Sequence, residues 1–290
     1  MPTSSPTVPD VLDAAEAVLA RSGILAPDVD SELIVGHVLG LGRGEVQAAR
    51  LTGRRLHPRD AALIAELADR RATREPVQHI TGVAGFRSLE LSVGPGVFVP
   101  RPETEQVTQI AIDALLAVPA PSPLAVDLGT GSGAIALSLA KEVPAARVFG
   151  VENSVDAFLW AVENSRRVGA ANASIIFDDL AHALPELDGT VSVVISNPPY
   201  VPDAAVPIDP EVRLFDPAAA LYGGEDGLDV VRVLSQAAAR LLQPGGTLVI
   251  EHGELQGASI RSILSADGWR APATFPDYTM RDRATTAIRS

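Results

Sequence analysis

Four consecutive residues could together hold one planar amino group: Asn197, Pro198, Pro199 and Tyr200. The Asn197 side chain offers a carbonyl oxygen as a hydrogen-bond acceptor. Pro198 has no N–H group, so its own carbonyl can accept without a competing local donor. Pro199 fixes the direction of the chain, and Tyr200 adds an aromatic face. Two acceptors beside a ring match an –NH2 group that is conjugated to a carbonyl or to an aromatic ring.

A glycine-rich turn indicates which co-substrate would react with such an amine. The turn follows an apolar strand that contains Asp127, and it consists of Gly129, Thr130, Gly131, Ser132 and Gly133. Dinucleotide sites have the longer spacing G-x-G-x-x-G, which brings a pyrophosphate to a helix N-terminus. The tighter G-x-G-x-G turn is typical of enzymes that use S-adenosylmethionine, which has no phosphate. Backbone without a Cβ can approach such a ligand closely, and Asp127 can accept hydrogen bonds nearby.

Acidic residues follow the next two expected strands. Glu152 lies roughly twenty residues beyond the turn, where a carboxylate can accept both ribose hydroxyls, one per oxygen. Alternatively, Glu152 stabilises the N-terminus of the helix that follows it. Asp178, Asp179 and Leu180 come after the third strand. Of these we assign Asp179 to the adenine amino group and Leu180 to the face of the adenine ring.

These features together predict methyl transfer to a nitrogen atom. A conjugated –NH2 group is a poor nucleophile because its lone pair is delocalised. Accepting a hydrogen bond from each N–H raises the electron density on nitrogen and aims the lone pair at the sulfonium methyl group. No strong general base is needed, because the proton leaves as the nitrogen becomes cationic. We expect Asn197, Pro198 and Tyr200 to be catalytic, and these three with Pro199 to bind the substrate.

The elements around these residues predict an α/β fold with a parallel sheet that helices cover on both faces. The carboxyl ends of parallel strands share one edge, so the glycine-rich turn, Glu152 and Asn197 should meet in one crevice. Two antiparallel edge strands are expected within 269–289. The predicted helices are 103–118, 134–141, 155–168, 228–242 and 257–266, and the predicted strands are 124–128, 147–151, 174–177, 191–196 and 247–251.

The chain before this region predicts a separate helical domain. Apolar residues recur at helical spacing over 10–21, 28–40 and 58–74. We therefore expect a helical domain at 1–82, a hairpin linker at 83–102 and the catalytic domain at 103–290. The loop 201–227 is long for a compact domain, and loops of this length are usually either functional or disordered.

Composition limits the possible partners. The 290 residues carry a net charge of −13, which gives no overall field that favours nucleic acid. The stretch 43–74 is locally basic, with eight arginines and four acids, and either faces RNA or an acidic partner or is a solvated helical face. The absence of cysteine excludes thiolate metal sites, and we expect no metal. The sequence has neither a signal peptide pattern nor an apolar run long enough to span a membrane.

Longer stretches of the chain resemble the PrmC/HemK family of release factor glutamine methyltransferases. The NPPY box is shared with adenine methyltransferases, whereas "PRPETE" and the block at 211–229 are more specific. Glu152 stands where the family commonly has Asp, and His79, to which we assign no role, where it commonly has Tyr. The resemblance rests on "REPVQHITG" (74–82), "GVFVPRPETE" (96–105), "VDLGTGSGAIAL" (126–137), "SNPPYV" (196–201), "EVRLFDPAAALYGGEDGLD" (211–229) and "LQPGGTLVIEHGELQG" (242–257).

The resemblance implies a Rossmann-like class I S-adenosylmethionine-dependent methyltransferase fold with a small N-terminal helical bundle. It implies that S-adenosylmethionine methylates the side-chain amide nitrogen of glutamine in the Gly-Gly-Gln motif of peptide chain release factors, leaving S-adenosylhomocysteine. The helical domain would grip the release factor, and we expect a cytoplasmic monomer without DNA or membrane partners. By position, cofactor contacts fall on residues 129–133, Glu152, Leu180 and Asn197.

Three questions stay open at this point. Arg101, Glu103 and Glu105 either line the cofactor pocket or cap the helix that starts near them. A rival enzyme is a DNA methyltransferase that acts on the adenine amino group, although such an enzyme should carry a basic groove. A second rival is a protein that binds S-adenosylmethionine without catalysis, which an intact NPPY box disfavours.

Overall fold

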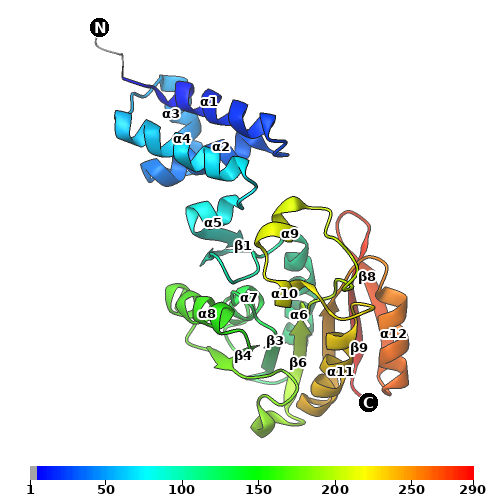
Figure 1. The fold of residues 1–290 in the computed structure, drawn as a ribbon. Helices are drawn as coiled ribbons and strands as arrows, with labels where there is room; N and C mark the ends of the chain where they lie inside the picture. Colours follow the sequence, from blue (N-terminus) through cyan, green and yellow to red (C-terminus); the bar gives the residue numbers. More distant parts are fainter. Residues whose placement is uncertain (1–4) are drawn as a thin grey trace. The chain divides into compact units, whose positions relative to one another are not determined.

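The computed structural model describes residues 5–290, and their contacts divide the chain into two compact units (Figure 1). The first contains Met1–Val83 together with Pro207–Phe215, and the second contains Ala84–Val206 and Asp216–Ser290. Most of the stretch that we expected to be a linker packs within the second unit, since Phe86, Leu89 and Leu91 belong to its core. Within the described residues, no helix is long and apolar enough to cross a membrane.

The first unit is a bundle of helices around one apolar core. Its elements are α1 (Val8–Arg21), α2 (Pro27–Leu39), α3 (Arg43–Thr52), α4 (Pro58–Ala72), α5 (Val77–Thr81) and α9 (Pro210–Phe215). Leu12, Leu19, Ile34 and Ile64 are fully buried in that core. The Thr7 and Asp10 side chains form a capping box that starts α1. The segment 207–215 joins this unit from the long loop after Tyr200, which its sequence did not indicate.

The second unit contains a seven-stranded sheet in the order β5-β4-β3-β6-β7-β9-β8. The strands β3 to β7 run parallel, and β9 pairs antiparallel with both β7 and β8. The chain adds β4 and β5 on one side of β3 and then returns to place β6 on the other. The strands are β3 (Leu124–Leu128), β4 (Arg147–Glu152), β5 (Ala173–Phe177), β6 (Val191–Ser196), β7 (Leu242–Glu251), β8 (Arg270–Pro276) and β9 (Asp282–Ile288).

Helices cover both faces of this sheet, as Figure 1 shows. Alternate strand residues point to opposite faces, so Ala125 packs with α6 and α7 whereas Val126 and Leu128 pack with α11 and α12. The strand β7 starts at Leu242 rather than 247, because Leu242 already pairs with Val191 before an irregular step in the register. The other elements are β1 (Val83–Phe86), β2 (Leu89–Ser92), α6 (Pro102–Leu116), α7 (Ala134–Glu142), α8 (Val155–Val168), η1 (Pro185–Leu187), α10 (Ala218–Leu221), α11 (Asp229–Leu241) and α12 (Gly257–Ala266).

This topology creates the crevice in which the predicted site residues should meet. The strand order reverses between β3 and β6, and ligands of open α/β sheets bind outside the carboxyl ends of the strands at such a point. The glycine-rich turn follows β3, and Asn197 follows β6. The two chemical features identified in the sequence therefore lie on neighbouring strands.

Candidate active site

The glycine-rich turn between β3 and α7 has a backbone that glycine adopts readily and other residues rarely do. Gly129, Gly131 and Gly133 have φ angles of 78°, 57° and 85°. A Cβ atom built on Gly129 or Gly131 meets no protein atom within 4 Å. The turn thus exposes bare backbone to open space, into which a ligand without phosphate can be brought close.

Asp127 lies beneath this turn and is fully buried. Its Oδ2 accepts hydrogen bonds from the Thr130 hydroxyl at 2.6 Å and from the Ala136 N–H at 3.2 Å. Its Oδ1 is buried and has no hydrogen-bond partner among residues 5–290. Burial raises the pKa of Asp127 to about 7, although the Thr130 and Ala136 hydrogen bonds act in the opposite direction. An unpaired buried acceptor beside the turn fits a ligand that carries a hydrogen-bond donor.

Glu152, at the end of β4, is held by backbone N–H groups. Its Oε2 accepts from Gly131 at 2.8 Å, and its Oε1 accepts from Asn153 at 3.0 Å and from Ser154 at 2.8 Å. The carboxylate therefore ties the glycine-rich turn to the start of α8, in line with the helix-terminus alternative. A carboxylate has about four acceptor positions, so three backbone bonds leave room for one ribose hydroxyl. Ribose binding by both oxygens stays a prediction, and the backbone bonds compete with it.

Asp179 and Leu180 follow β5 at the same edge of the sheet. Asp179 is exposed, and its Oδ1 accepts a hydrogen bond from the Ala181 N–H at 2.9 Å. Leu180 is half-buried and packs against the core beneath α11. Their contact with an adenine ring stays a prediction.

The NPPY residues begin where β6 ends. The Ser196 hydroxyl donates to the Leu128 carbonyl at 2.5 Å, which fixes the end of β6 to the end of β3. Asn197 therefore lies beside the glycine-rich turn. Among the described residues, no donor bonds to the Asn197 Oδ1 or to the Pro198 carbonyl. Neither of the acceptors that the sequence singled out is thus occupied by a protein donor among residues 5–290.

A second glycine-rich segment clamps the backbone after Pro198. The Tyr200 carbonyl accepts from the Gln256 side-chain amide at 2.9 Å. A Cβ on Gly223 would lie 2.4 Å from the Pro199 carbonyl oxygen, and one on Gly227 would lie 2.2 Å from the Tyr200 carbonyl oxygen. The "GGEDG" stretch (223–227), which is part of the block 211–229 that resembles the family, thus packs directly against the NPPY backbone.

The surroundings of Tyr200 suit an aromatic ring that packs against a ligand rather than a phenolate that accepts a proton. Burial, followed by the nearby Glu251 carboxyl, raises the pKa of the Tyr200 phenol to about 12. The phenol therefore stays protonated at neutral pH. Its ring can cover one side of a bound planar group, and this role stays a prediction.

The polar residues of "PRPETE" have different partners. Neither of the two expected roles, lining the cofactor pocket or capping the helix, describes all of them. Arg101 occupies the N-cap position of α6 without a side-chain capping bond. Its guanidinium instead pairs with Asp216 at 2.6 Å and lies over the Phe98 ring, 5.0 Å from the ring centre. Glu105 accepts from the Arg87 N–H at 2.9 Å. The Arg101–Asp216 pair joins two of the stretches that carry the family resemblance.

Three polar residues near the site were not predicted from the sequence. Asn164, on α8, donates to the Ser132 carbonyl at 2.9 Å and so braces the glycine-rich turn. Thr104 and Glu251 lie behind Asn197, on α6 and at the end of β7. Glu251 had a usable signal, because it is an acid at the carboxyl end of a predicted parallel strand. Asn164 and Thr104 lie within helices and had no such signal.

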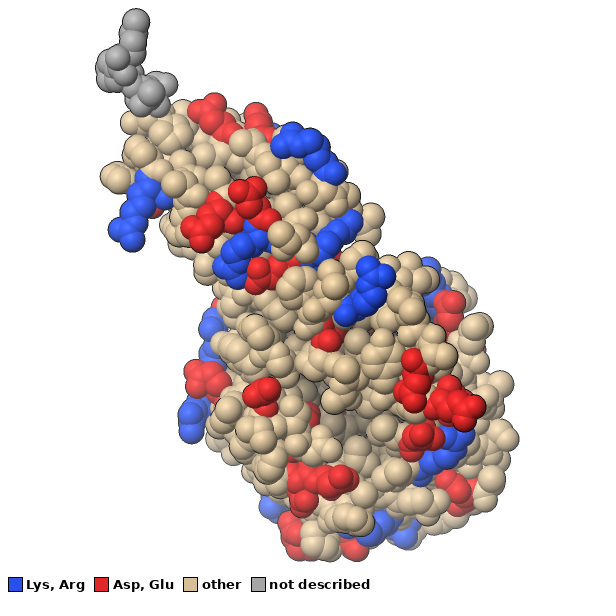
Figure 2. Space-filling model, viewed as in Figure 1, with Lys and Arg blue, Asp and Glu red and all other residues tan. Residues whose placement is uncertain are grey.

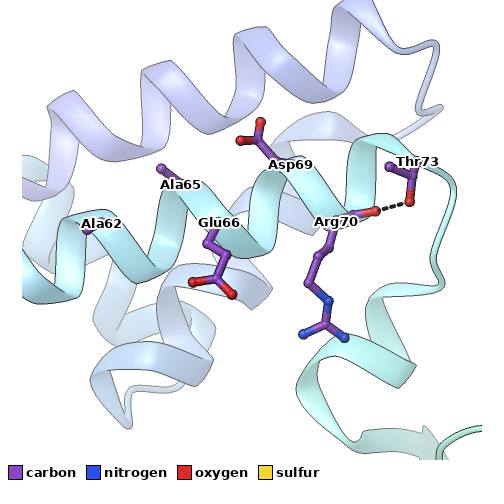
Figure 3. A pocket seen from close by; sticks show the side chains of 6 residues that line it. All are labelled: Ala62, Ala65, Glu66, Asp69, Arg70 and Thr73. Carbon is purple, nitrogen blue, oxygen red and sulfur yellow. Dashed lines mark hydrogen bonds between the residues drawn. The ribbon is translucent and has the colours of Figure 1, made fainter.

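The arginine stretch of the first unit is largely paired with acids, and Figure 2 shows blue and red side chains interspersed. Arg71 is buried and pairs with Asp30 and with Glu211, both at 2.7 Å. The hollow in Figure 3 lies along α4, where acids and Arg70 line it and the Thr73 hydroxyl donates to the Arg70 carbonyl. It has none of the acceptor geometry seen at Asn197. Five of the eight arginines have ion pairs among the described residues: Arg43, Arg50, Arg70, Arg71 and Arg74.

Known proteins match both parts of the chain. A family model described as the PrmC N-terminal domain matches residues 10–82, and one described as the methyltransferase small domain matches residues 88–224. A release factor glutamine methyltransferase from Streptomyces coelicolor is 46% identical over 277 residues, which is 94% of this chain and 94% of that protein. The family resemblance seen in the sequence is thereby confirmed.

Two other similar proteins extend the comparison. A 4-amino-L-phenylalanine/4-methylamino-L-phenylalanine methyltransferase from Streptomyces pristinaespiralis is 40% identical over 296 residues, covering 100% of this chain and 98% of its own. The solved structure of a T. thermophilus 16S rRNA N2 G1207 methyltransferase with AdoMet and guanosine has a TM-score of 0.53. It is 21% identical and aligns with 72% of this chain and 50% of its own, which supports the fold alone. The chain belongs to the PrmC family of release factor glutamine methyltransferases and has the Rossmann-like class I methyltransferase fold predicted from its sequence.

Proposed function

We propose that this protein transfers the methyl group of S-adenosylmethionine to the side-chain amide nitrogen of glutamine in the Gly-Gly-Gln motif of peptide chain release factors. The observation that carries the proposal is the pair of acceptors at Asn197 and Pro198 that no donor among residues 5–290 occupies, beside the bare backbone of the glycine-rich turn. The name of the 46% identical relative supports the choice of glutamine as the acceptor.

The proposed binding of S-adenosylmethionine rests on the open space and the unpaired acceptor at the glycine-rich turn. Gly129 and Gly131 leave open space where a side chain would otherwise stand, and Asp127 presents a buried acceptor without a partner. S-adenosylmethionine would supply an electrophilic methyl group on a sulfonium. Asp127, Glu152, Asp179 and Leu180 are the side chains that we propose to contact it, together with residues 129–133 and Asn197.

The protein's part in the reaction is to hold the amide nitrogen. The Asn197 Oδ1 and the Pro198 carbonyl would each accept one N–H of the glutamine amide, which increases the density of the nitrogen lone pair and directs it along one line. The N–CH3 bond forms as the C–S bond breaks, and the nitrogen then loses a proton to solvent. The Tyr200 ring would cover one side of the planar amide.

The experiment is methylation of a release factor, followed by mass spectrometry of its peptides. We expect one added methyl group, on the glutamine of the Gly-Gly-Gln motif, and S-adenosylhomocysteine as the second product. Absence of transfer to the release factor, with S-adenosylmethionine still bound, would refute glutamine as the methyl acceptor and leave either another acceptor or cofactor binding without catalysis.

A small aromatic amine is a second candidate substrate, because the Streptomyces pristinaespiralis relative is named for 4-amino-L-phenylalanine. Such an amine is also conjugated, so the Asn197–Pro198 acceptors suit it equally well. Parallel assays with 4-amino-L-phenylalanine and with duplex DNA distinguish the classes. We expect the release factor to react with the highest kcat/KM, and a faster reaction of the amine or the DNA would reassign the substrate.

A further inference from the structure

Two buried polar side chains lie directly behind Asn197. Thr104, in the first turn of α6, is 4% exposed, and Glu251, the last residue of β7, is 1% exposed. The Asn197 Nδ2 donates to the Thr104 hydroxyl at 3.4 Å. The side chains of Thr104 and Asn197 are also close enough to the Glu251 carboxyl to lower its pKa. The amide that faces the substrate thus has a polar support of two residues from different elements.

The chemistry of these groups decides which way the Asn197 amide points. A primary amide has a donor end and an acceptor end, and only the acceptor end can receive the N–H of a substrate. An ionised carboxylate accepts hydrogen bonds but cannot donate them. Glu251 and Thr104 therefore favour the orientation in which the Asn197 –NH2 group faces inward and Oδ1 faces the crevice.

Glu251 has features that stability alone does not explain. Its Oε2 is buried without a hydrogen-bond partner among residues 5–290, and burying such a group unpaired is unfavourable. The charged neighbours are Arg283 on β9 and Glu103 on α6, and the Tyr200 phenol also faces it. A buried carboxyl at the carboxyl end of a central strand, next to the proposed reacting group, is typical of a functional site.

We propose that Glu251, together with Thr104, is a positioning residue that fixes the Asn197 side-chain amide with its oxygen toward the substrate nitrogen. The proposal rests on the proposed function, because it assigns a task within the same site. Glu251 touches neither the glutamine nor the cofactor in this role. It acts through Asn197 and determines the fraction of molecules in which the Asn197 Oδ1 points toward the substrate nitrogen.

The protonation state of Glu251 gives the proposal a measurable consequence. Burial raises the pKa of Glu251 to about 7, against the hydrogen bonds from Thr104 and Asn197 and the charge of Arg283, while Glu103 raises it further. A protonated Glu251 can donate to the Asn197 Oδ1 and so stabilise the flipped amide. The kcat should therefore rise with pH through about 7, and this rise should depend on Glu251.

The first test is Glu251→Gln, which preserves shape but adds a donor that can bond to the Asn197 Oδ1. We expect kcat to fall by about 10- to 100-fold, by analogy with the range seen when a residue that orients a metal ligand is replaced. The KM values for the release factor and for S-adenosylmethionine should change little, and the rise of kcat near pH 7 should disappear. A wild-type kcat with an unchanged pH profile would overturn the proposal.

A matched pair at Thr104 guards against an effect on folding. Thr104→Val removes the hydroxyl at constant shape, whereas Thr104→Ser keeps it. We expect Val to lower kcat and Ser to restore most of it, at similar melting temperatures. Equal kcat values for the two variants would contradict the role of the hydroxyl.

A readout without turnover separates this proposal from the proposed function. The side-chain NH2 signals of Asn197 can be followed by 15N NMR and assigned by their absence in Asn197→Ala. In the wild type they should exchange slowly with solvent, and in Glu251→Gln they should shift and exchange faster. Failure to methylate a release factor would refute the proposed function, whereas unchanged Asn197 signals in Glu251→Gln would refute the positioning role.

Discussion

At the scale of single residues, Asn197 is the side chain on which the proposed chemistry depends most. Its Oδ1 is a free acceptor at the end of β6, and its Nδ2 is bonded to Thr104. Replacement by alanine removes the acceptor but leaves the glycine-rich turn and Asp127 in place. We expect Asn197→Ala to fold and to bind S-adenosylmethionine, with kcat lowered by about 10²- to 10³-fold, as when an oxyanion-hole donor is deleted.

Calorimetric binding of S-adenosylmethionine and single-turnover rates check this prediction together. A variant that turns over near the wild-type rate would exclude Asn197 from the reaction. A variant that loses cofactor binding in proportion to rate would instead make Asn197 a cofactor residue only.

Asp127 carries a prediction about pH and stability. Its folded pKa, about 7, lies above the value of about 3.9 for an exposed aspartate in an unfolded chain. At pH values between these two pKa values, the folded protein binds more protons than the unfolded chain. The contribution of Asp127 protonation to the free energy of unfolding is therefore fully present below about pH 4 and is lost as pH rises through 7. In Asp127→Asn, the amide oxygen can accept the Thr130 and Ala136 donors without a charge. We expect its melting temperature to fall less between pH 5.5 and pH 8 than that of the wild type.

Thermal unfolding at a series of pH values measures this difference. Asp179→Asn is the matched control, because Asp179 is exposed at the same edge of the sheet, and it should keep the wild-type pH dependence. Glu251 should contribute with the same sign as Asp127, so part of the dependence remains in Asp127→Asn. An identical pH dependence in Asp127→Asn and the wild type would show that Asp127 is not the group responsible.

At the scale of elements, the "GGEDG" turn decides the position of the NPPY backbone. Gly223 has a negative φ, so a side chain there is excluded by space rather than by backbone strain. We expect Gly223→Ala to displace the Pro199 carbonyl, since the added Cβ would lie 2.4 Å from its oxygen. A misplacement of about 1 Å can lower a rate by about 10²-fold, so the main effect should be on kcat.

Steady-state kinetics of Gly223→Ala and Gly85→Ala provide the comparison. Gly85 also lacks a positive φ, and a Cβ there meets no atom within 4 Å. The Gly85 variant should keep the wild-type kcat. Equal kcat values for the two variants would mean that the NPPY segment does not depend on this packing.

The parallel strands and the acceptor pair were predictable because each depends on local sequence. Apolar runs followed by Gly129, Glu152 and Asn197 gave both the strands and their carboxyl ends. The helix α3 was missed because it is short and mostly polar, with Val46 and Ala49 as its only buried residues. Thr104 was missed because its proximity to Asn197 arises from the packing of α6 against β6 and β7, which no local pattern encodes. Glu251 could have been found, because it is an acid at the carboxyl end of a predicted parallel strand.

At the scale of the whole molecule, the arginine stretch needs a different interpretation from the one that its composition suggested. Arg71 is buried between Asp30 and Glu211, so it holds the segment 207–215 on the helical unit and cannot contact a partner. Arg70 pairs with Glu75. Neutralising either would therefore test stability rather than substrate binding. The variants chosen to test a contact with the release factor must avoid both.

Three other arginines are suited to that test: Arg54, Arg55 and Arg59 are exposed and have no ion pair among residues 5–290. If the helical unit binds an acidic surface of the release factor, replacing all three arginines by glutamine should raise the KM for the release factor by about fivefold. The reason is that each exposed charge pair contributes ~0.2–1 kcal/mol. The kcat and the KM for S-adenosylmethionine should stay constant, and added salt should reduce the difference. Arg43→Gln with Arg50→Gln is the control, because these arginines already pair with acids of their own unit. Equal KM values for the triple variant and the wild type would assign these arginines to a solvated face and move the grip to another surface of the helical unit.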